Sequence, residues 1–257
     1  MERGPELIFL PCAGFGNRLR AIASALVAAE AAGRSIRIIW TRQHNIFVAP
    51  FREIFKSQGL PSWVTIEDVE FNAEPYWARA KLVRNEAEWL AMAGEPVLKS
   101  YYAFYKEGSE RWLQMLRRFQ VSEHIETLKF LAINHLQLRR PMVGVHIRRT
   151  DNRACIEKSP SELFWKKMAQ YSEDTMFYVA SDSQEEKYEI FKRFPGRVVM
   201  GVEELIGRNS IFGCIDSVLE FYILSQSSEI LGSYKSSFSE VAAAYGGAKL
   251  VPMIKDN

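Results

Sequence analysis

The sequence predicts an α/β protein made of two Rossmann-like domains. Short apolar runs alternate with helical patterns from one end of the chain to the other, and this alternation is typical of parallel sheets covered by helices. The 257 residues suffice for two domains of about 120 to 130 residues each, and the 47% hydrophobic content is enough for a core in both.

Seven apolar runs of strand length and five helical patterns support this class. The expected strands are 7–11, 35–40, 142–147, 176–180, 197–200, 229–232 and 249–251. The expected helices are 17–32, 161–171, 184–194, 214–226 and 237–245. The stretch 45–140 is rich in aromatic residues and is expected to be mostly helical or irregular. Pro141 disfavours helix just before it, so we expect an N-terminal domain at 1–138 and a C-terminal domain at 139–257.

Composition excludes several classes of protein. The net charge is +2 and the basic residues are interleaved with acidic ones, which argues against a nucleic-acid partner. The three cysteines lie far apart without metal-ligand spacing, so we expect no disulfide framework, no zinc site and a reducing compartment. Neither a signal peptide nor an apolar run of about 18 residues is present, and we expect a cytoplasmic protein without a membrane span.

The run "VGVHIRRTDN" places charge at the tip of an apolar strand. Side chains alternate along a strand, so Arg148 and Arg149 should point to opposite faces. At the carboxyl end of a parallel strand Arg148 is placed to hold an anion with its guanidinium group, while Arg149 should pair with Asp151 or brace the loop. A surface ion pair after a core strand is the alternative.

Two further strand ends carry polar residues that can meet Arg148. Asp182 follows the strand 176–180 and would lie in the same crevice, although a helix N-cap would also explain it. Ser237 and Glu240 fit a capping box, while Ser236 and the free amides at this helix start fit an anion site. The two interpretations of this helix start are compatible, because Ser237 can cap the helix while Ser236 and the free amides face an anion.

The turn after the first expected strand contains Gly14, Gly16 and Asn17. A Gly-x-Gly pair is weak evidence, because a tight strand-to-helix turn also uses it. The third glycine of the dinucleotide fingerprint is missing, and no P-loop motif occurs in the sequence. NAD chemistry and P-loop ATP chemistry are therefore disfavoured.

Four segments in order resemble motifs of the fucosyltransferase superfamily, which includes α1,6-fucosyltransferases, nodulation fucosyltransferases and protein O-fucosyltransferases. They are "GFGNRLRAIASA", "VGVHIRRTD", "FYVASD" and "LEFYILSQSSEILGSYKSSFSEVA". The resemblance implies two facing Rossmann-like domains of the GT-B type. It also implies an inverting, metal-independent transfer of L-fucose from GDP-fucose, with the donor held mainly by the C-terminal domain and no further cofactor.

The resemblance also assigns roles by position. Arg148 would bind the donor β-phosphate, and Ser236 with its helix start would contact the same diphosphate. His146 and Glu220 match positions that contact guanine. Asp182 matches an acidic position in the nucleotide region. Asn17, with the turn from Gly14 to Gly16, matches an N-terminal loop that faces donor and acceptor.

Departures from the family pattern leave alternatives open. Glu220 stands where α1,6 enzymes carry Asp, and Ser183 where they carry a second acid. His146 would also suit a satisfied core histidine, and Glu220 a solvated helix face. Glu157 is the candidate general base, with Asp151 as its rival.

The functional alternatives are a transferase that uses another GDP-sugar or a UDP-sugar, and a non-catalytic glycan- or nucleotide-binding module whose aromatic stretch serves as a sugar platform. A nucleotide sugar and a glycan acceptor are the expected partners. Acceptor, linkage and oligomeric state do not follow from the sequence.

Overall fold

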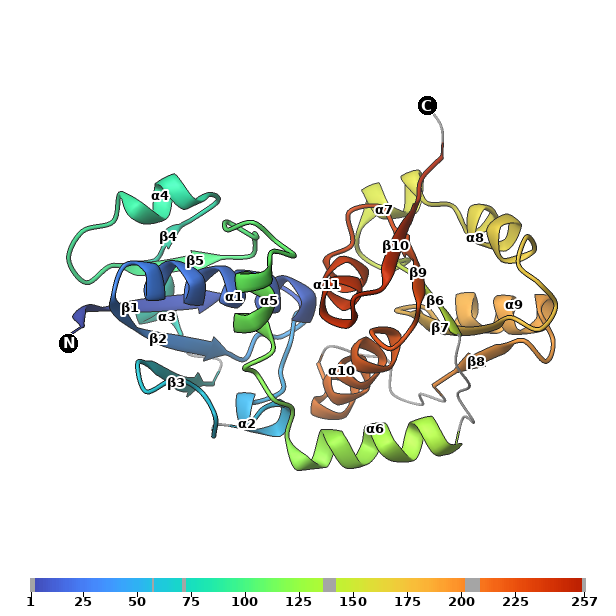
Figure 1. The fold of residues 1–257 in the computed structure, drawn as a ribbon, viewed down its shortest axis with the longest axis horizontal. Helices are drawn as coiled ribbons and strands as arrows, with labels where there is room; N and C mark the ends of the chain where they lie inside the picture. Colours follow the sequence, from blue (N-terminus) through green and yellow to red (C-terminus); the bar gives the residue numbers. More distant parts are fainter. Residues whose placement is uncertain (1–2, 57, 71–72, 136–141, 202–208, 256–257) are drawn as a thin grey trace. The chain divides into compact units, whose positions relative to one another are not determined.

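The computed structural model describes residues 3–56, 58–70, 73–135, 142–201 and 209–255. The described chain divides into two compact units, each with its own five-stranded sheet (Figure 1). The first unit holds the described residues up to Ile125 together with those from 209 to Ile215, and the second holds the rest. The boundary that we expect near residues 138–141 lies outside the described residues, because 136–141 are not among them.

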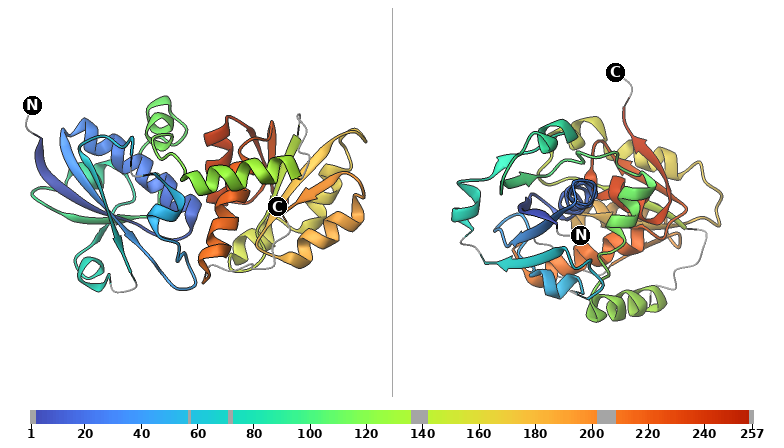
Figure 2. Two further views of the ribbon diagram at one scale, coloured as in Figure 1. Left: turned by 90° about the horizontal axis from the view of Figure 1, so that it is seen from below. Right: turned by 60° about the vertical axis from the view of Figure 1, so that its left-hand side comes forward.

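The N-terminal unit has the strand order β3-β2-β1-β5-β4, with every neighbouring pair parallel. Its strands are β1 (Gly4–Pro11), β2 (Arg34–Thr41), β3 (Val64–Val69), β4 (Lys81–Leu82) and β5 (Val97–Ser100). Its helices are α1 (Phe15–Ala31), α2 (Phe51–Ile54), α3 (Glu74–Trp77), α4 (Glu86–Leu90) and α5 (Glu110–Leu116). Helix α1 is rich in alanine and buried around most of its circumference, because it packs on β1, on β2 and against α5 (Figure 2).

The expectation for the stretch 45–140 is wrong in part, because three of the five N-terminal strands come from it. Strand β4 has two residues, and most side chains of β3 are only half-buried, so neither shows the continuous apolar run of a buried parallel strand. Strand β5 has only two apolar residues, Val97 and Leu98, which are too few to form a recognisable strand pattern. These strands are fixed by pairing with a neighbour rather than by their own sequence: β3 pairs with β2, β5 pairs with β1, and β4 pairs with β5.

Aromatic side chains from this stretch fill the N-terminal core. The Trp40 ring centroid lies 5.8 Å from that of Phe47 and 5.6 Å from that of Phe51. Trp89 stacks on Phe104 with centroids 5.2 Å apart, and Trp112 is fully buried. The aromatic content of the stretch is therefore mainly a packing feature.

The C-terminal unit has the strand order β10-β9-β6-β7-β8, again with parallel neighbours throughout. Its strands are β6 (Met142–Ile147), β7 (Met176–Ser181), β8 (Val198–Met200), β9 (Glu229–Ser233) and β10 (Lys249–Met253). Its helices are α7 (Arg153–Lys158), α8 (Ser161–Met168), α9 (Gln184–Arg193) and α11 (Ser237–Gly246). The chain passes between the units within α6 (Glu123–His135) and within α10 (Ile211–Leu224). All five strands expected after residue 142 are confirmed, and the expected helices agree to within about three residues.

Strand β6 is central, and all six of its residues are buried. Val143, Val145 and Ile147 belong to a core shared with α8 and α9. The other face meets α10 and α11: a Cβ atom at Gly144 would lie 2.6 Å from Leu224 Cδ1, so a larger residue here would force the Leu224 side chain of α10 to move. The expected alternation of side chains along this strand is confirmed.

Candidate functional site

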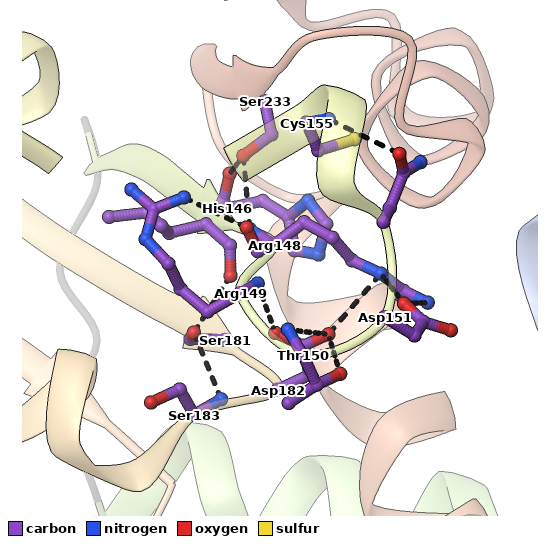
Figure 3. A network of polar contacts seen from close by, with 12 residues as sticks. His146, Arg148, Arg149, Thr150, Asp151, Cys155, Ser181, Asp182, Ser183 and Ser233 are labelled. Atoms are coloured by element: carbon purple, nitrogen blue, oxygen red, sulfur yellow. Dashed lines mark hydrogen bonds and ion pairs between the residues drawn. The ribbon is translucent and has the colours of Figure 1, made fainter. Parts of the chain in front are cut away.

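Three parallel strand ends meet at one edge of the C-terminal sheet. Ile147 of β6 pairs in register with Ser181 of β7, and His146 pairs with Gly232 of β9. The residues after each strand therefore converge, and Figure 3 shows the resulting network. Ser233 Oγ lies between the strands, accepting from the Arg148 amide at 3.0 Å and donating to the His146 carbonyl at 3.2 Å. A crevice at the carboxyl ends of parallel strands is where α/β proteins bind ligands.

Asp182 organises the loop after β6. Its Oδ1 accepts from the Arg149 amide at 2.7 Å, and its Oδ2 accepts from Thr150 Oγ1 at 2.6 Å (Figure 3). The N-cap alternative for Asp182 is wrong, because the side chain that caps α9 is Ser183, which accepts from the Glu186 amide. Asp182 therefore fixes the loop backbone through charged hydrogen bonds.

Arg148 lies between two carboxylates. Its Nε and Nη2 donate to Asp151 Oδ1 at 2.8 and 2.5 Å, and its Nε lies 3.2 Å from Asp182 Oδ2. The Arg148 side chain is 20% exposed and that of Asp151 is 49% exposed, so the ion pair between them faces solvent on one side. A guanidinium held this way can exchange one carboxylate for another anion without losing its second partner.

Arg149 turns away from Arg148 and braces the loop, as expected. Its partner is Glu186 of α9, with Nε to Oε2 at 3.0 Å, and not Asp151. The Arg149 Nη2 also donates to Ser161 Oγ and to the Ser159 carbonyl. With its side chain only 13% exposed, Arg149 ties the strand end to α8 and α9.

His146 is buried beneath the same edge. Its ring stacks on Phe238 of α11 with centroids 4.7 Å apart. Burial, and secondarily the charge of Arg148, lowers the pKa of His146 to about 3, so the ring is neutral near pH 7. Its Nδ1 has no hydrogen-bond partner among the described residues. The alternative that His146 is a core histidine with all of its hydrogen bonds made is therefore wrong, because Nδ1 makes none with the described residues.

Glu220 on α10 is buried and 7% exposed, so the alternative of a solvated helix face is wrong. Lys187 Nζ of α9 donates to Glu220 Oε1 at 2.6 Å, and the Lys187 side chain has no exposed surface. Sequence reasoning missed Lys187. A signal was present, since Lys187 and Ile190 are three residues apart and form one helix face, and a lysine on an apolar face requires a partner.

The turn between β9 and α11 brings Ser236 to this edge. Ser236 occupies the N-cap position without a side-chain capping bond, and Ser237 is the first helical residue. The capping-box expectation for Ser237 is therefore wrong by one position. Ser159 Oγ accepts from the Tyr234 amide at 2.8 Å, which fixes the turn, and Lys235 takes a positive φ of 46°. The first amides of a ten-residue helix are thus held at the carboxyl end of β9.

The candidate bases occupy different surroundings. Asp151 belongs to the Arg148 network, whereas Glu157 is exposed on α7 and forms no side-chain hydrogen bond or ion pair in the part of the chain that the structure describes. In the same part of the chain, no group of three or more His, Cys, Asp or Glu side chains is arranged to hold a metal ion. None of the described helices is both long and apolar enough to cross a bilayer.

The N-terminal turn is built on a buried arginine. Gly14 is the N-cap of α1, and Gly16 and Asn17 lie in its first turn. Arg18 is fully buried, and its Nε donates to the Ala13 carbonyl at 2.9 Å. Its Nη1 donates to the carbonyl that ends β2, at Thr41, at 2.8 Å. This turn belongs to the N-terminal unit, whereas the network around Arg148 belongs to the C-terminal unit.

Comparison with solved structures identifies the fold. NodZ α-1,6-fucosyltransferase co-crystallised with GDP matches with a TM-score of 0.66 and 18% identity, over 94% of this chain and 92% of that chain. The chain has the fold of a fucosyltransferase. Fucosyltransferase NodZ from Bradyrhizobium matches with a TM-score of 0.65 and 18% identity over 94% and 92% of the two chains. POFUT1 in complex with GDP-fucose matches with a TM-score of 0.60 and 13% identity over 98% of each chain. No family model and no curated protein sequence matches the chain. The expected class of two Rossmann-like α/β units of GT-B type is confirmed.

Proposed function

We propose that the chain is an inverting, metal-independent glycosyltransferase that moves L-fucose from GDP-fucose to a hydroxyl group of a glycan. The observation that carries the proposal is Arg148, a largely buried guanidinium at the carboxyl end of the central strand, whose amide is bonded to Ser233 of β9, the strand that leads into α11. Support for the donor comes from the fold, since NodZ crystals contain GDP and POFUT1 crystals contain GDP-fucose. The three cysteines are buried and form no disulfide, which supports a cytoplasmic reaction.

The diphosphate is the group that this strand edge is suited to hold. Arg148 provides a planar pair of donors, and the amides after Ser236 add oriented dipoles. As the bond between the sugar C1 and the phosphate oxygen breaks, its electron pair moves onto the departing GDP. Arg148 and the helix start stabilise that charge in the role that a metal fills elsewhere. EDTA should leave turnover unchanged.

His146 and Glu220 are assigned to guanine. A carboxylate accepts two hydrogen bonds from the adjacent N1-H and N2-H groups of the base, and a neutral imidazole has one donor and one acceptor. Both side chains are buried in the C-terminal unit, where desolvation strengthens such contacts. Asp182 and Arg149 are assigned to holding the loop rather than to touching the donor.

The acceptor hydroxyl attacks C1 on the face opposite the diphosphate, and its proton must pass to a base. We assign this role to Glu157, whose carboxylate is exposed and not held by a cation. Asp151 is assigned the role of counter-ion of Arg148. The turn with Gly14, Gly16 and Asn17 is assigned to the acceptor side.

The experiment is a thermal-shift panel followed by mass spectrometry of products. GDP should stabilise the protein more than UDP or ADP, and incubation with GDP-fucose and a panel of glycans should release GDP and add one fucose. Stronger stabilisation by UDP would exclude the guanine assignment of Glu220. Transfer from another GDP-sugar, but not from GDP-fucose, would retain the mechanism and change the donor.

One observation favours a second candidate, a non-catalytic glycan-binding module. Tyr101 and Tyr102 follow β5, are 38% and 37% exposed, and have ring centroids 4.2 Å apart. Ser100 Oγ accepts from the Tyr102 amide at 3.0 Å and fixes the bend that brings the rings together. An exposed aromatic pair of this kind can stack on a sugar ring. Such a module would bind glycan without consuming donor, so release of GDP in the presence of acceptor counts against it.

A further inference from the structure

Burying the ion pair of Lys187 and Glu220 costs desolvation free energy that a contribution to stability alone does not offset. The Lys187 side chain has no exposed surface and that of Glu220 is 10% exposed, with 2.6 Å between Nζ and Oε1. Removing two charges from water is expensive, and well-packed apolar residues of similar volume are often equally stabilising. A buried ion pair is therefore weak evidence for a purely structural role.

The surroundings connect this pair to His146. The His146 ring stacks on Phe238, and the Phe238 ring meets that of Phe221 edge-on at 5.5 Å, directly next to Glu220 along α10. The charge of Lys187 is also among those that lower the pKa of His146. Side chains from β6, α9, α10 and α11 thus form one buried group that includes both residues assigned to guanine.

Within this group the exposed surface decides which residue can meet a ligand. Lys187 cannot touch a nucleotide, because none of its side chain is accessible, whereas Glu220 keeps a small accessible surface. A carboxylate has two oxygens and about four acceptor positions, so it can accept from Lys187 and from a base together. The lysine also favours the ionised carboxylate, which is the form that only accepts hydrogen bonds.

We propose that Lys187 is a positioning residue that sets nucleobase selectivity by holding Glu220 ionised and oriented toward the N1-H and N2-H edge of a guanine nucleotide. The proposal rests on the proposed function, because it takes GDP as the ligand. It adds a residue on α9, outside the segments that contact the donor, which decides how strongly the base is discriminated.

The experiment measures the affinities of GDP and of inosine diphosphate, which lacks only the 2-amino group, by calorimetry on the full chain. The wild type should bind GDP about 10- to 100-fold more tightly, as expected for one hydrogen bond to a charged acceptor. Lys187→Met should reduce this ratio to about 3-fold or less, and Lys187→Arg should retain most of it. Lys192→Met, at an exposed position on the same helix, is the matched control and should leave the ratio unchanged.

A double-mutant cycle tests whether Lys187 acts through Glu220. Lys187→Met combined with Glu220→Gln should bind both nucleotides as Glu220→Gln alone does, because the lysine has no further effect once the carboxylate is gone. The double variant removes both charges of the pair, so it also serves if Lys187→Met does not fold.

The outcomes separate the two proposals. A wild-type protein that does not bind GDP contradicts the proposed function itself. GDP binding without discrimination against inosine diphosphate, a Lys187→Met ratio equal to that of the wild type, or additive effects in the cycle would each overturn the role of Lys187 while leaving the proposed function standing.

Discussion

The turn after β1 and the loop after β6 both contain an arginine next to a strand end, but the two arginines are used differently. Arg18 is fully buried and donates to two backbone carbonyls, and its guanidinium lies 4.7 Å from the ring centroid of Trp40. Arg148 is one-fifth exposed and pairs with carboxylates. In the first unit the cation stabilises the backbone, whereas in the second it is available to exchange partners.

This difference shows how to separate a structural cation from one that binds a ligand. Burial lowers the pKa of Arg18 to about 10, and no carboxylate among the described residues lies within ion-pair distance of it. Its contacts are carbonyls and rings, which a soluble anion cannot replace. The carboxylate of Asp151 is half exposed, and under the proposed function a phosphate displaces it from Arg148.

The largest expected effect is that of Arg148→Ala on turnover. Under the proposed function Arg148 stabilises the departing diphosphate, so removing its side chain should lower kcat/KM about 100- to 1000-fold, measured by product formation from GDP-fucose. The melting temperature should change little, because the loop is held by Asp182 and Arg149. Arg153→Ala, at an exposed position on α7, is the control and should retain activity. An Arg148→Ala enzyme with full turnover would refute the mechanism.

Arg18→Met should produce a stability effect without a binding effect. The carbonyls of Ala13 and Thr41 lose their donors, and part of that cost is regained because a buried charge is removed. We expect the free energy of unfolding to fall by about 2 kcal/mol, and the affinity for GDP to stay unchanged. Arg111→Met, which breaks a partly exposed ion pair with Glu30, should cost less than about 0.5 kcal/mol. Weakened GDP binding in folded Arg18→Met would contradict a purely structural role for Arg18.

His146→Gln should alter the acid sensitivity of the fold. The unfolded chain binds a proton at His146 below pH 6.5, whereas the folded protein does so only near the lowered pKa of about 3. Acid therefore favours the unfolded state, and the wild type loses stability from this group as pH falls through that window. Between pH 6 and pH 5 the wild type should lose about 1 kcal/mol more than the variant, measured by urea unfolding. Parallel pH profiles would mean that His146 is protonated in the folded protein.

The smallest effect is expected for Asp151→Asn. The substitution removes a displaceable counter-ion of Arg148, so GDP should bind about 2- to 5-fold more tightly in a calorimetric titration. Turnover should survive, whereas Glu157→Gln should lose it. A loss of kcat in Asp151→Asn with tighter GDP binding would transfer the role of general base to Asp151.

How much of the fold and of the candidate site could be predicted depends on whether a local sequence pattern indicates each feature. Strands β6, β7 and β9 are buried parallel strands with continuous apolar runs, so their ends, and the residues Arg148, Asp182 and Ser236 that follow, were accessible to sequence reasoning. Strands β3 to β5 were not, since pairing with neighbouring strands defines them. The exact capping serine could not be chosen because two serines are adjacent.

The partners of the charged residues were the least predictable feature. Arg149 fits a brace from strand alternation, but its pairing with Glu186 rather than Asp151 depends on where α9 docks. The burial of Lys187 against Glu220 likewise joins two helices that are far apart in the sequence. Contacts of this kind follow from tertiary packing, which no local pattern contains.

In the proposed function, Arg148 holds the diphosphate of a nucleotide at the end of β6. The most direct test is to titrate GDP and guanosine, which lacks the diphosphate, into the wild type and into Arg148→Ala. We predict that Arg148→Ala loses about 10- to 100-fold in affinity for GDP and nothing in affinity for guanosine, because only the phosphate contact is removed. Unchanged GDP affinity, or an equal loss for both ligands, would contradict the account.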